Sequence, residues 1–230
     1  MKCGRSQSEI STGKPTNFLA FFVSSNDGKV EHAPDDPCKI VFLGDYIDRG
    51  PNSRDVLRTV RNLHSEGAIC LRGNHEGLMI EANASELSRQ SFLLNGGTET
   101  LRSLQTSSAF DEARSWMSML PTWYEDELHY FVHAGVKPNL PLAQQSDRDR
   151  MWIRDSFLRY KGAFEKYIVH GHTPVQMTNP DAILPEVLTN RCNVDTGAAG
   201  SGPLSAAIFN NLRPTPWYIL SSESQIVHLT

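Results

Sequence analysis

The sequence lacks the features that mark secreted, membrane-spanning and nucleic-acid-binding proteins. Its four cysteines include no Cys-x-x-Cys pair, which predicts free thiols in a reducing cytoplasm rather than disulfides or a zinc finger. It has no run of about eighteen apolar residues, so we expect no membrane-spanning helix and no membrane partner. The formal net charge of -4 at pH 7 gives no basic field, and nucleic acid is therefore not an expected partner.

What the chain does contain is an ordinary globular composition. Hydrophobic residues make up 39% of it and charged residues 21%, which is enough for one α/β core. The apolar stretch Phe18 to Val23 is short and follows Lys14 and Pro15, so we expect no signal peptide and a cytoplasmic location. Residues 1–37 show no regular pattern, whereas residues 38–230 do. We therefore divide the chain into an atypical N-terminal segment and one domain.

Two polar loops, each directly after an apolar run, are the most informative features of the chain. The run Lys39 to Leu43 precedes Gly44-Asp45-Tyr46-Ile47-Asp48-Arg49-Gly50, and the run Ala68 to Leu71 precedes Arg72-Gly73-Asn74-His75-Glu76. A carboxylate at the end of a strand is a natural metal ligand. A second carboxylate beside it can orient a histidine, and an arginine can bind a phosphoryl oxygen. Together the loops predict a metal-dependent phosphate site.

Two further loops have the same character. His133 precedes Ala134-Gly135 after an apolar run, and His172 stands in Gly171-His172-Thr173 after an expected strand at residues 167–169. Glycines beside these histidines allow the backbone to pack close to an ion. Ligands of open α/β sheets bind beyond the carboxyl ends of the strands. We therefore expect all four loops to converge on one point.

The segments between the loops predict an α/β protein. Apolar residues at helical spacing indicate a helix from Ser53 to His64, and its position between two strands implies that they are parallel. Residues 75–119 indicate helices with a break at Gly96-Gly97, residues 123–132 a hairpin and residues 147–159 a helix. The C-terminal part is rich in strands. This order predicts two packed sheets with helices outside.

Four motifs in this order, GDYIDRG, LRGNHE, VHAG and HGHTP, resemble those of the calcineurin-like metallophosphoesterases. More narrowly, they are similar to the bacterial and phage serine/threonine branch of the phosphoprotein phosphatase family. Residues 193–198 (NVDTGA) and 202–204 (GPL) also resemble that branch. The resemblance implies that residues 38–230 form one calcineurin-like phosphoesterase domain. It also implies a four-layer α/β-β/α sandwich of two mixed sheets flanked by helices, with an atypical N-terminal part.

The resemblance implies a site with two divalent metal ions, which would be manganese, iron or zinc. Asp45 would bridge the two ions, and three side chains would complete the second metal site: Asn74, His133 and His172. A metal pair can lower the pKa of bound water and stabilise an in-line displacement. The ligand types do not choose among the three metals.

The resemblance also assigns residues to the reaction itself. His75 would be the general acid that protonates the leaving oxygen, and Asp48 would orient its ring. A histidine beside a carboxylate suits proton transfer near neutral pH. Arg49 and Arg154 would bind the phosphate oxygens, because a planar guanidinium matches a phosphoryl group.

One motif of the family is missing. The family opens with a strand and Gly-Asp-x-His-Gly, whose Asp and His hold the first metal. The corresponding window here, residues 11–19, contains neither residue, and Asp-x-His occurs nowhere in the chain. We therefore expect an incomplete or distorted first sheet, and either two ions or only one. The nearby substitutes have a different spacing; they are Asp27, Glu31, His32, Asp35 and Asp36.

Three interpretations of this departure stay open. The N-terminus could be altered by a frameshift or a wrong start. The protein could be a degenerate phosphatase that binds one metal or a phosphorylated ligand without turnover. Finally, Asp27, Glu31 or His32 could supply ligands in a new geometry.

The function that the resemblance implies is hydrolysis of phosphate monoesters on serine or threonine, with a phosphoprotein or another phosphate ester as substrate. A metal-held hydroxide would attack phosphorus, without a phosphoenzyme intermediate. Two alternatives stay open. One is a diadenosine tetraphosphate hydrolase, whose motifs are similar, and the other is a non-catalytic phosphate-binding protein.

Overall fold

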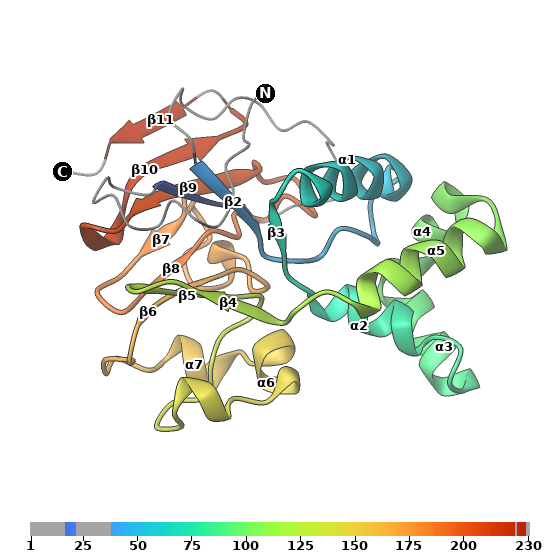
Figure 1. Ribbon diagram of the computed structural model, residues 1–230, viewed down its shortest axis with the longest axis horizontal. Helices are drawn as coiled ribbons and strands as arrows, with labels where there is room; N and C mark the ends of the chain where they lie inside the picture. Colours follow the sequence, from blue (N-terminus) through green and yellow to red (C-terminus); the bar gives the residue numbers. More distant parts are fainter. Residues whose placement is uncertain (1–16, 22–37, 224, 229–230) are drawn as a thin grey trace.

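The computed structural model describes residues 17–21, 38–223 and 225–228. Within these residues the chain forms two mixed β-sheets with helices on their outer sides (Figure 1). Helix α1 (Ser53–Ser65) lies along the first sheet, and α6 (Asp147–Trp152) and α7 (Asp155–Leu158) lie beside the second. The predicted α/β class and four-layer sandwich are therefore confirmed.

Six strands form the first sheet: Asn17–Phe21 (β1), Cys38–Phe42 (β2), Ile69–Cys70 (β3), Ser205–Asn210 (β9), Arg213–Ser221 (β10) and Gln225–His228 (β11). They lie in the order β11-β10-β9-β1-β2-β3. β1, β2 and β3 are parallel to one another, and α1 connects β2 to β3 as predicted. β9, β10 and β11 extend the sheet in antiparallel fashion from β1.

Five strands form the second sheet: Trp123–Glu125 (β4), His129–Val132 (β5), Tyr167–His170 (β6), Glu186–Val187 (β7) and Arg191–Asn193 (β8). They lie in the order β4-β5-β6-β8-β7. β4 and β5 form the predicted hairpin, whereas β5, β6 and β8 are parallel. Because parallel strands end at the same edge of a sheet, the loops after β5 and β6 leave together.

Alternate residues of the strands pack into different apolar cores, which defines the layers. Val41 of β2 and Phe131 of β5 belong to the core between the two sheets. Phe42 joins the core under the helices of the first sheet, and Tyr130 packs in the core that includes Phe157 of α7. Burial of one such side chain contributes about 1.5–3 kcal/mol to folding. The two sheets are thus held together by side chains of opposite strands.

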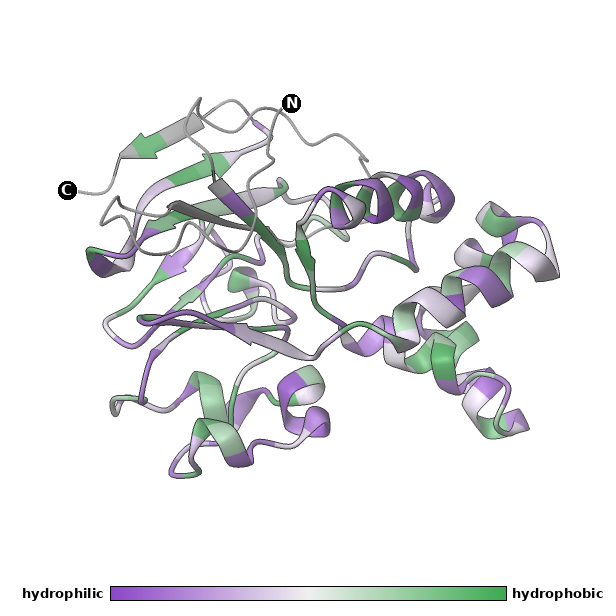
Figure 2. Cartoon of the chain, viewed as in Figure 1, coloured by the Kyte–Doolittle hydropathy of each residue, from purple (hydrophilic) through white to green (hydrophobic). Residues whose placement is uncertain are grey.

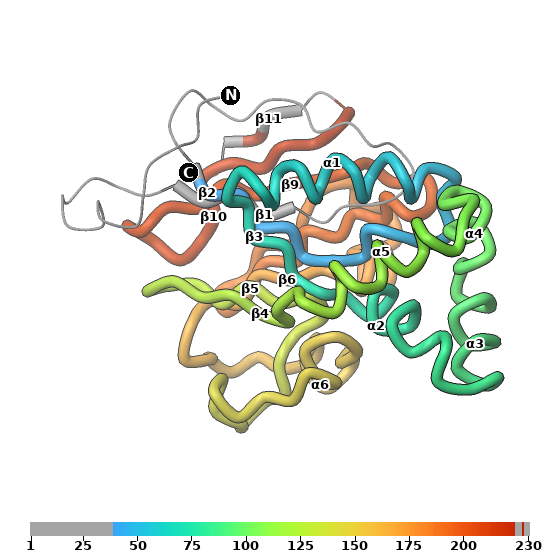
Figure 3. Tube along the Cα trace, turned by 45° about the vertical axis from the view of Figure 1, so that its right-hand side comes forward, coloured from blue at the N-terminus to red at the C-terminus, as the bar shows by residue number. Residues whose placement is uncertain are grey.

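The segment between β3 and β4 forms a helical arm beyond the edge of the sheets (Figures 1 and 3). Its helices are Asn74–Glu81 (α2), Glu86–Phe92 (α3), Leu93–Gly97 (η2, a π-helical turn), Thr98–Leu104 (α4) and Ser107–Ser118 (α5). Gly96 has a φ of 107°, which confirms the break expected at Gly96-Gly97. Figure 2 shows mixed hydrophilic and hydrophobic colours along α1, in contrast to the hydrophobic β3. This is consistent with the amphipathic pattern that predicted the helix.

Two expectations are corrected by the described residues. The first sheet is not missing its opening strand, because β1 lies between β2 and β9. β1 ends at Phe21, so the window chosen for the absent motif, residues 11–19, does not follow that strand. The alternative ligands at residues 27, 31, 32, 35 and 36 lie outside the described residues.

The second correction concerns residues 147–159, which form two short helices instead of one. The chain leaves the helical conformation at Ile153 and Arg154, whose ψ angles are 142° and -102°. Arg154 therefore stands at the junction of α6 and α7, not on a helix face. The change of direction places it beside Thr173, to which it donates a hydrogen bond.

The helices and thiols of the described residues bear on two further expectations. Among the described residues, no helix has both the length and the apolar content that crossing a bilayer requires. Cys70 and Cys192 are buried and free, as predicted. Burial raises the pKa of Cys70 to about 12, so its thiol stays protonated and unreactive.

Candidate active site

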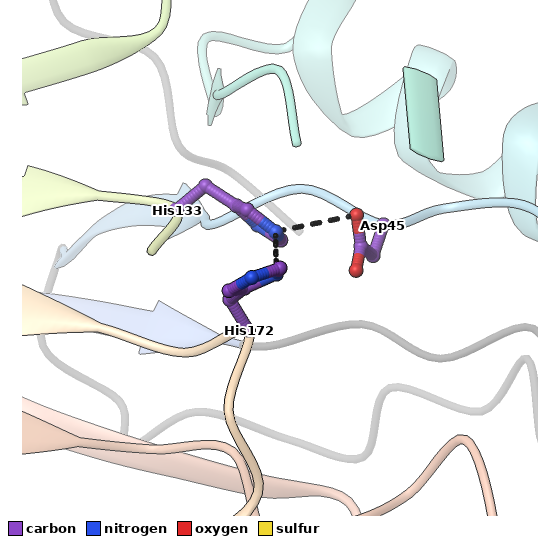
Figure 4. A group of neighbouring side chains, drawn as sticks. All are labelled: Asp45, His133 and His172. Atoms are coloured by element: carbon purple, nitrogen blue, oxygen red, sulfur yellow. Dashed lines mark hydrogen bonds and ion pairs between the residues drawn. The ribbon is translucent and has the colours of Figure 1, made fainter. Parts of the chain in front are cut away.

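The structure brings the four predicted metal ligands together at one edge of the two sheets. Asp45 follows β2, Asn74 begins α2 directly after β3, and His133 and His172 follow β5 and β6. The Nε2 atom of His133 lies 2.8 Å from Asn74 Oδ1, 3.1 Å from His172 Nδ1 and 3.4 Å from Asp45 Oδ1. Figure 4 shows the contacts of Asp45 and His172 meeting at the same ring nitrogen of His133. The four loops thus converge as the sequence predicted.

The chemistry of these atoms fits a cation. The Nδ1–H of His133 donates to the carbonyl oxygen of Leu43 at 2.8 Å, so its Nε2 carries a lone pair. That lone pair faces the amide oxygen of Asn74 and the carboxylate of Asp45. Acceptors this close repel one another unless a positive ion lies among them, and all are ordinary ligand types. Potential ligand atoms of Asp45, His133 and His172 lie within 4.8 Å of one another.

The second nitrogen of His172 supports the same conclusion. Its Nε2 is buried and has no hydrogen-bond partner among the described residues. Burial, together with His133, lowers the pKa of His172 to about 2, and burial also lowers the pKa of His133. Both imidazoles are therefore neutral near pH 7, which is the form that binds a metal.

The backbone of the site is held in an unusual conformation. Four of the six non-glycine residues with positive φ in the described part of the chain lie here: Asp45, Asp48, Arg49 and His172. Each such residue costs about 1–3 kcal/mol and persists only where its surroundings fix it. Gly44 also has a positive φ, of 103°, and a side chain there would meet the backbone nitrogen of Gly73 at 2.6 Å. The first two loops are thus in direct backbone contact.

Glu76 joins these two loops. Its Oε2 accepts hydrogen bonds from the backbone N–H groups of Asp45 and Gly73, and its Oε1 accepts one from Tyr46, each at 2.8 Å. Burial raises the pKa of Glu76 to about 7, although the three N–H groups oppose this. Sequence analysis gave Glu76 no role. Its position three residues after Gly73, at the start of a helix, is the signal of a capping box.

The predicted acid pair forms beside this cluster. His75 Nδ1 lies 2.7 Å from Asp48 Oδ2, and both side chains are almost fully buried. The backbone N–H of His75 donates to Asp45 Oδ1 at 3.3 Å. Burial alone would lower the pKa of His75, but the carboxylates of Asp45 and Asp48 outweigh it and raise the pKa. The protonated imidazole, which can donate a proton, is therefore favoured.

The two predicted phosphate-binding arginines lie at the solvent-exposed rim of the site. Arg49 and Arg154 are both exposed, and the charge of Arg154 contributes to the lowered pKa values of His133 and His172. Their guanidinium groups are accessible to an incoming anion. The indole of Trp152, 38% exposed, lies edge-on to His172 with ring centroids 6.3 Å apart and forms part of the same rim.

Asp195 is a further acidic group near the site, and it follows β8 of the second sheet. It is buried, and the N–H of Gly197 donates to its Oδ1 at 3.0 Å. Burial raises the pKa of Asp195 to about 7, and Asp45, Arg49 and Arg154 contribute to its electrostatic environment. The sequence offered one signal for it, the NVDTGA stretch at residues 193–198.

Comparison with known proteins identifies the family. The calcineurin-like phosphoesterase family model matches residues 17–199, which is well over half of the chain. The chain belongs to the calcineurin-like phosphoesterases, a family of metal-dependent hydrolases of phosphate esters. The match includes β1, so the family pattern begins before residue 38.

Curated relatives of the chain carry two kinds of name. Serine/threonine-protein phosphatase 1 of Salmonella typhimurium is 28% identical over 73% of this chain and 77% of its own length. The asymmetrical bis(5'-nucleosyl)-tetraphosphatase PrpE of Bacillus thuringiensis is 28% identical over 74% of this chain and 75% of its own length. A symmetrical bis(5'-nucleosyl)-tetraphosphatase of Nitrosospira multiformis is 32% identical, but the match covers 46% of this chain and 36% of that protein.

Solved structures support the fold. A cold-active protein-tyrosine phosphatase of a Shewanella species superposes with a TM-score of 0.61 and 14% identity, over 93% of this chain and 80% of the other. A serine/threonine phosphatase of Saccharomyces cerevisiae gives a TM-score of 0.50 and 16% identity, over 84% and 72% of the two chains. At such low identity these similarities concern the architecture alone.

Proposed function

We propose that this protein is a metal-dependent phosphomonoester hydrolase of the serine/threonine protein phosphatase type. The observation that supports this function is the position of the His75–Asp48 pair directly beside the cluster of Asp45, Asn74, His133 and His172. A phosphate bound at this cluster would have a proton donor next to its ester oxygen. A cation site next to a buried His–Asp pair suits metal-assisted hydrolysis with proton donation to the leaving group.

Each part of the site has a proposed task. Asp45, Asn74, His133 and His172 would hold a divalent ion, and the bound ion would supply Lewis-acid chemistry for water activation and phosphoryl charge. Arg49 and Arg154 bind phosphoryl oxygens from the rim, where both are exposed. His75 donates a proton to the departing oxygen, and Asp48 holds its ring in the required tautomer. The charge that develops in the reaction is thereby matched on both sides of the phosphorus.

The number of ions is a separate proposal. The described residues Asp45, His133 and His172 could hold one ion, and we propose that the carboxylate of Asp45 would also serve a second ion, as the resemblance to the family implies. We propose manganese, iron or zinc as the metal. Metal analysis of the purified protein gives the stoichiometry: two ions per chain support the two-metal site, and one ion supports a site reduced to the described ligands.

A second candidate function is hydrolysis of dinucleoside polyphosphates. It is favoured by the names of the relatives from Bacillus and Nitrosospira. We rank it second because the two arginines lie on an open rim, which suits a phosphate carried on a large surface. One hollow of about 420 Å³ lies away from these arginines; its lining is Lys161, Val187, Leu188, Thr189, Asn190 and Thr215.

One set of assays separates these functions. The Mn²⁺-loaded protein is tested on phosphoserine and phosphothreonine peptides, on p-nitrophenyl phosphate and on diadenosine tetraphosphate, with His75→Ala as the control for contaminating enzymes. The proposal predicts a higher kcat/KM on the phosphopeptides than on the dinucleotide. The reverse order would favour the second candidate. Bound metal without turnover on any substrate would favour a non-catalytic phosphate-binding protein.

A further inference from the structure

We propose that Thr100, on the helical arm, is the positioning residue that sets the Asp48–His75 pair for proton donation. The proposal rests on the proposed function, in which His75 is the acid. Thr100 lies 52 residues from Asp48 in the sequence, and it belongs to none of the four motifs that form the site. It is completely buried.

The hydroxyl of Thr100 makes two hydrogen bonds to the same residue. Its Oγ1 accepts from the backbone N–H of Asp48 at 2.8 Å and donates to Asp48 Oδ1 at 2.6 Å. Because its single proton is directed to the carboxylate, the contact with Ser53 Oγ at 3.3 Å has Ser53 as donor. The hydroxyl is thus fully used, and it holds both the backbone and the side chain of Asp48.

This double contact determines which oxygen of Asp48 faces His75. With Oδ1 bound to Thr100, Oδ2 is the oxygen that remains for His75 Nδ1, at 2.7 Å. Asp48 also has a φ of 74°, a conformation that needs support from its surroundings. Thr100 supplies that support from the opposite side of the carboxylate. The ring of His75 is therefore oriented through a chain of two hydrogen bonds that begins on another helix.

The break in the arm explains how Thr100 reaches this place. The N–H of Arg49 donates to the carbonyl oxygen of Gly96 at 3.2 Å. A side chain at Gly96 would meet the backbone nitrogen of Arg49 at 2.6 Å, and its φ of 107° also favours glycine. The kink therefore lets the arm contact the Asp48–Arg49 backbone, and α4 starts two residues later with Thr100 in its first turn.

The effect on the reaction depends on the leaving group. Without the hydroxyl, the N–H and Oδ1 of Asp48 lose their bonds to Thr100, and the orientation of the carboxylate toward His75 is less firmly fixed. Proton donation then becomes slower. An alkyl phosphate needs this proton, because an alkoxide is a poor leaving group, whereas p-nitrophenolate leaves without much assistance. The loss should therefore be selective for alkyl phosphates.

Thr100→Val is the direct test, because valine has nearly the same shape and no hydroxyl. Thr100→Ser keeps the hydroxyl, and Thr98→Val is the matched control on the same helix, where no side-chain hydrogen bond is found among the described residues. We expect Thr100→Val to lower kcat on a phosphoserine peptide about tenfold more than on p-nitrophenyl phosphate, a part of the general acid contribution. Thr100→Ser should keep the wild-type ratio of kcat on the phosphopeptide to kcat on p-nitrophenyl phosphate. The metal content of each variant should equal that of the wild type. An equal loss on both substrates would overturn the proposal.

A second measurement does not depend on activity. Proton NMR of the folded protein should show a downfield, exchange-protected Nδ1–H resonance for His75, assigned by its disappearance in His75→Ala. The resonance should be lost in Thr100→Val and kept in Thr100→Ser. If Thr100→Val does not fold, Thr100→Ala is read in the same way. A resonance that persists in the hydroxyl-free variant would refute the positioning role, whereas a wild-type protein with the resonance and no turnover would refute only the proposed function.

Discussion

His75 is linked to Asp45 by a hydrogen bond from its backbone N–H to Asp45 Oδ1, over 3.3 Å. The residue proposed as the acid and the carboxylate proposed to hold the metal are therefore fixed relative to each other by the main chain, and not only by their side chains. This arrangement separates two properties that mutation can test one at a time. Metal retention should depend on Asp45 and His133, and proton transfer on the side chain of His75.

Removal of a ligand should remove the metal. Asp45→Asn removes the negative charge of the cluster, and His133→Ala removes its central nitrogen, Nε2. We expect neither variant to retain the ion. The measurement is metal content after gel filtration of the Mn²⁺-loaded protein. His64→Ala, at an exposed histidine, is the matched control and should bind as the wild type does. Full metal content in His133→Ala would contradict the ligand assignment.

Removal of the acid should slow turnover and leave the metal in place. His75→Ala keeps the backbone N–H that contacts Asp45 but lacks the imidazole. We expect kcat on a phosphopeptide to fall by about a hundredfold or more, the usual contribution of a general acid. Metal content and the unfolding curve, measured on the same samples, show whether the loss is chemical. A rate equal to that of the wild type would exclude His75 from the proposed role.

Glu76→Gln tests the link between the first two loops. The side chain of glutamine has one oxygen where glutamate has two. At least one of the backbone N–H groups of Asp45, Tyr46 and Gly73 therefore loses its acceptor. We expect a loss of about 1–3 kcal/mol in the free energy of unfolding, and weaker metal binding in the variant. Chemical denaturation and a metal titration measure the two effects. The exposed Glu81→Gln on the same helix is the control; similar values for both variants would show that Glu76 is not the link.

Arg154→Lys tests the recognition of phosphate. Lysine keeps the charge but cannot form the paired hydrogen bonds of a guanidinium. We therefore expect KM for a phosphopeptide to rise, and product inhibition by inorganic phosphate to weaken, by about tenfold, which corresponds to the loss of one charge-assisted hydrogen bond. Arg159 is an exposed arginine at the other end of α7, and Arg159→Lys should change neither the KM nor the inhibition constant of phosphate. Unchanged phosphate inhibition in Arg154→Lys would exclude this arginine from the phosphate site.

The turn between β4 and β5 should make stability depend on pH. Asp126 Oδ1 accepts from the N–H groups of Leu128 and His129, and both carboxylate oxygens contact His129 Nδ1. Burial opposes ionisation of Asp126, but these bonds outweigh it and lower the pKa in the folded state. A carboxyl group whose pKa is lower in the folded than in the unfolded chain stabilises the fold fully at a pH above its unfolded-state pKa. This stabilisation is lost as the pH falls toward the folded-state pKa.

The matching experiment compares the wild type with Asp126→Asn. Near neutral pH we expect the variant to be less stable by about 1–2 kcal/mol. This difference in the free energy of unfolding should become smaller as the pH falls below 3.8, the ordinary pKa of an aspartate carboxyl group. Denaturant unfolding at several pH values measures this difference. Asp55→Asn, at an exposed carboxylate, is the control and should have nearly the stability of the wild type at every pH. A gap that widens in acid would reverse the sign of the argument.

The sequence predicted the loops of the site because each signal is local. A strand followed by a glycine-flanked Asp, Asn or His places a ligand at the edge of a sheet, and this placement does not depend on distant parts of the sequence. Helix α1 was predictable for a similar reason, because Val56, Leu57 and Val60 repeat at helical spacing and are all buried. The parallel order of β2 and β3 then followed from the connection between them.

The features that sequence analysis missed depend on distant partners. The bonds of Glu76 to Asp45 and of Thr100 to Asp48 span 31 and 52 residues, and no local pattern announces them. β1 was missed because its sequence resembles an isolated apolar patch until β2 and β9 lie on either side of it. The turn at Arg154 was missed because residues 147–159 contain no glycine or proline to mark the end of a helix.

The most direct measurement is anomalous X-ray scattering at the manganese edge from crystals of the protein grown with Mn²⁺. A peak is expected about 2.0–2.4 Å from ligand atoms of Asp45, Asn74, His133 and His172. A manganese ion bound only at other residues, or a protein that hydrolyses phosphate esters with no ion at these four side chains, would contradict the account.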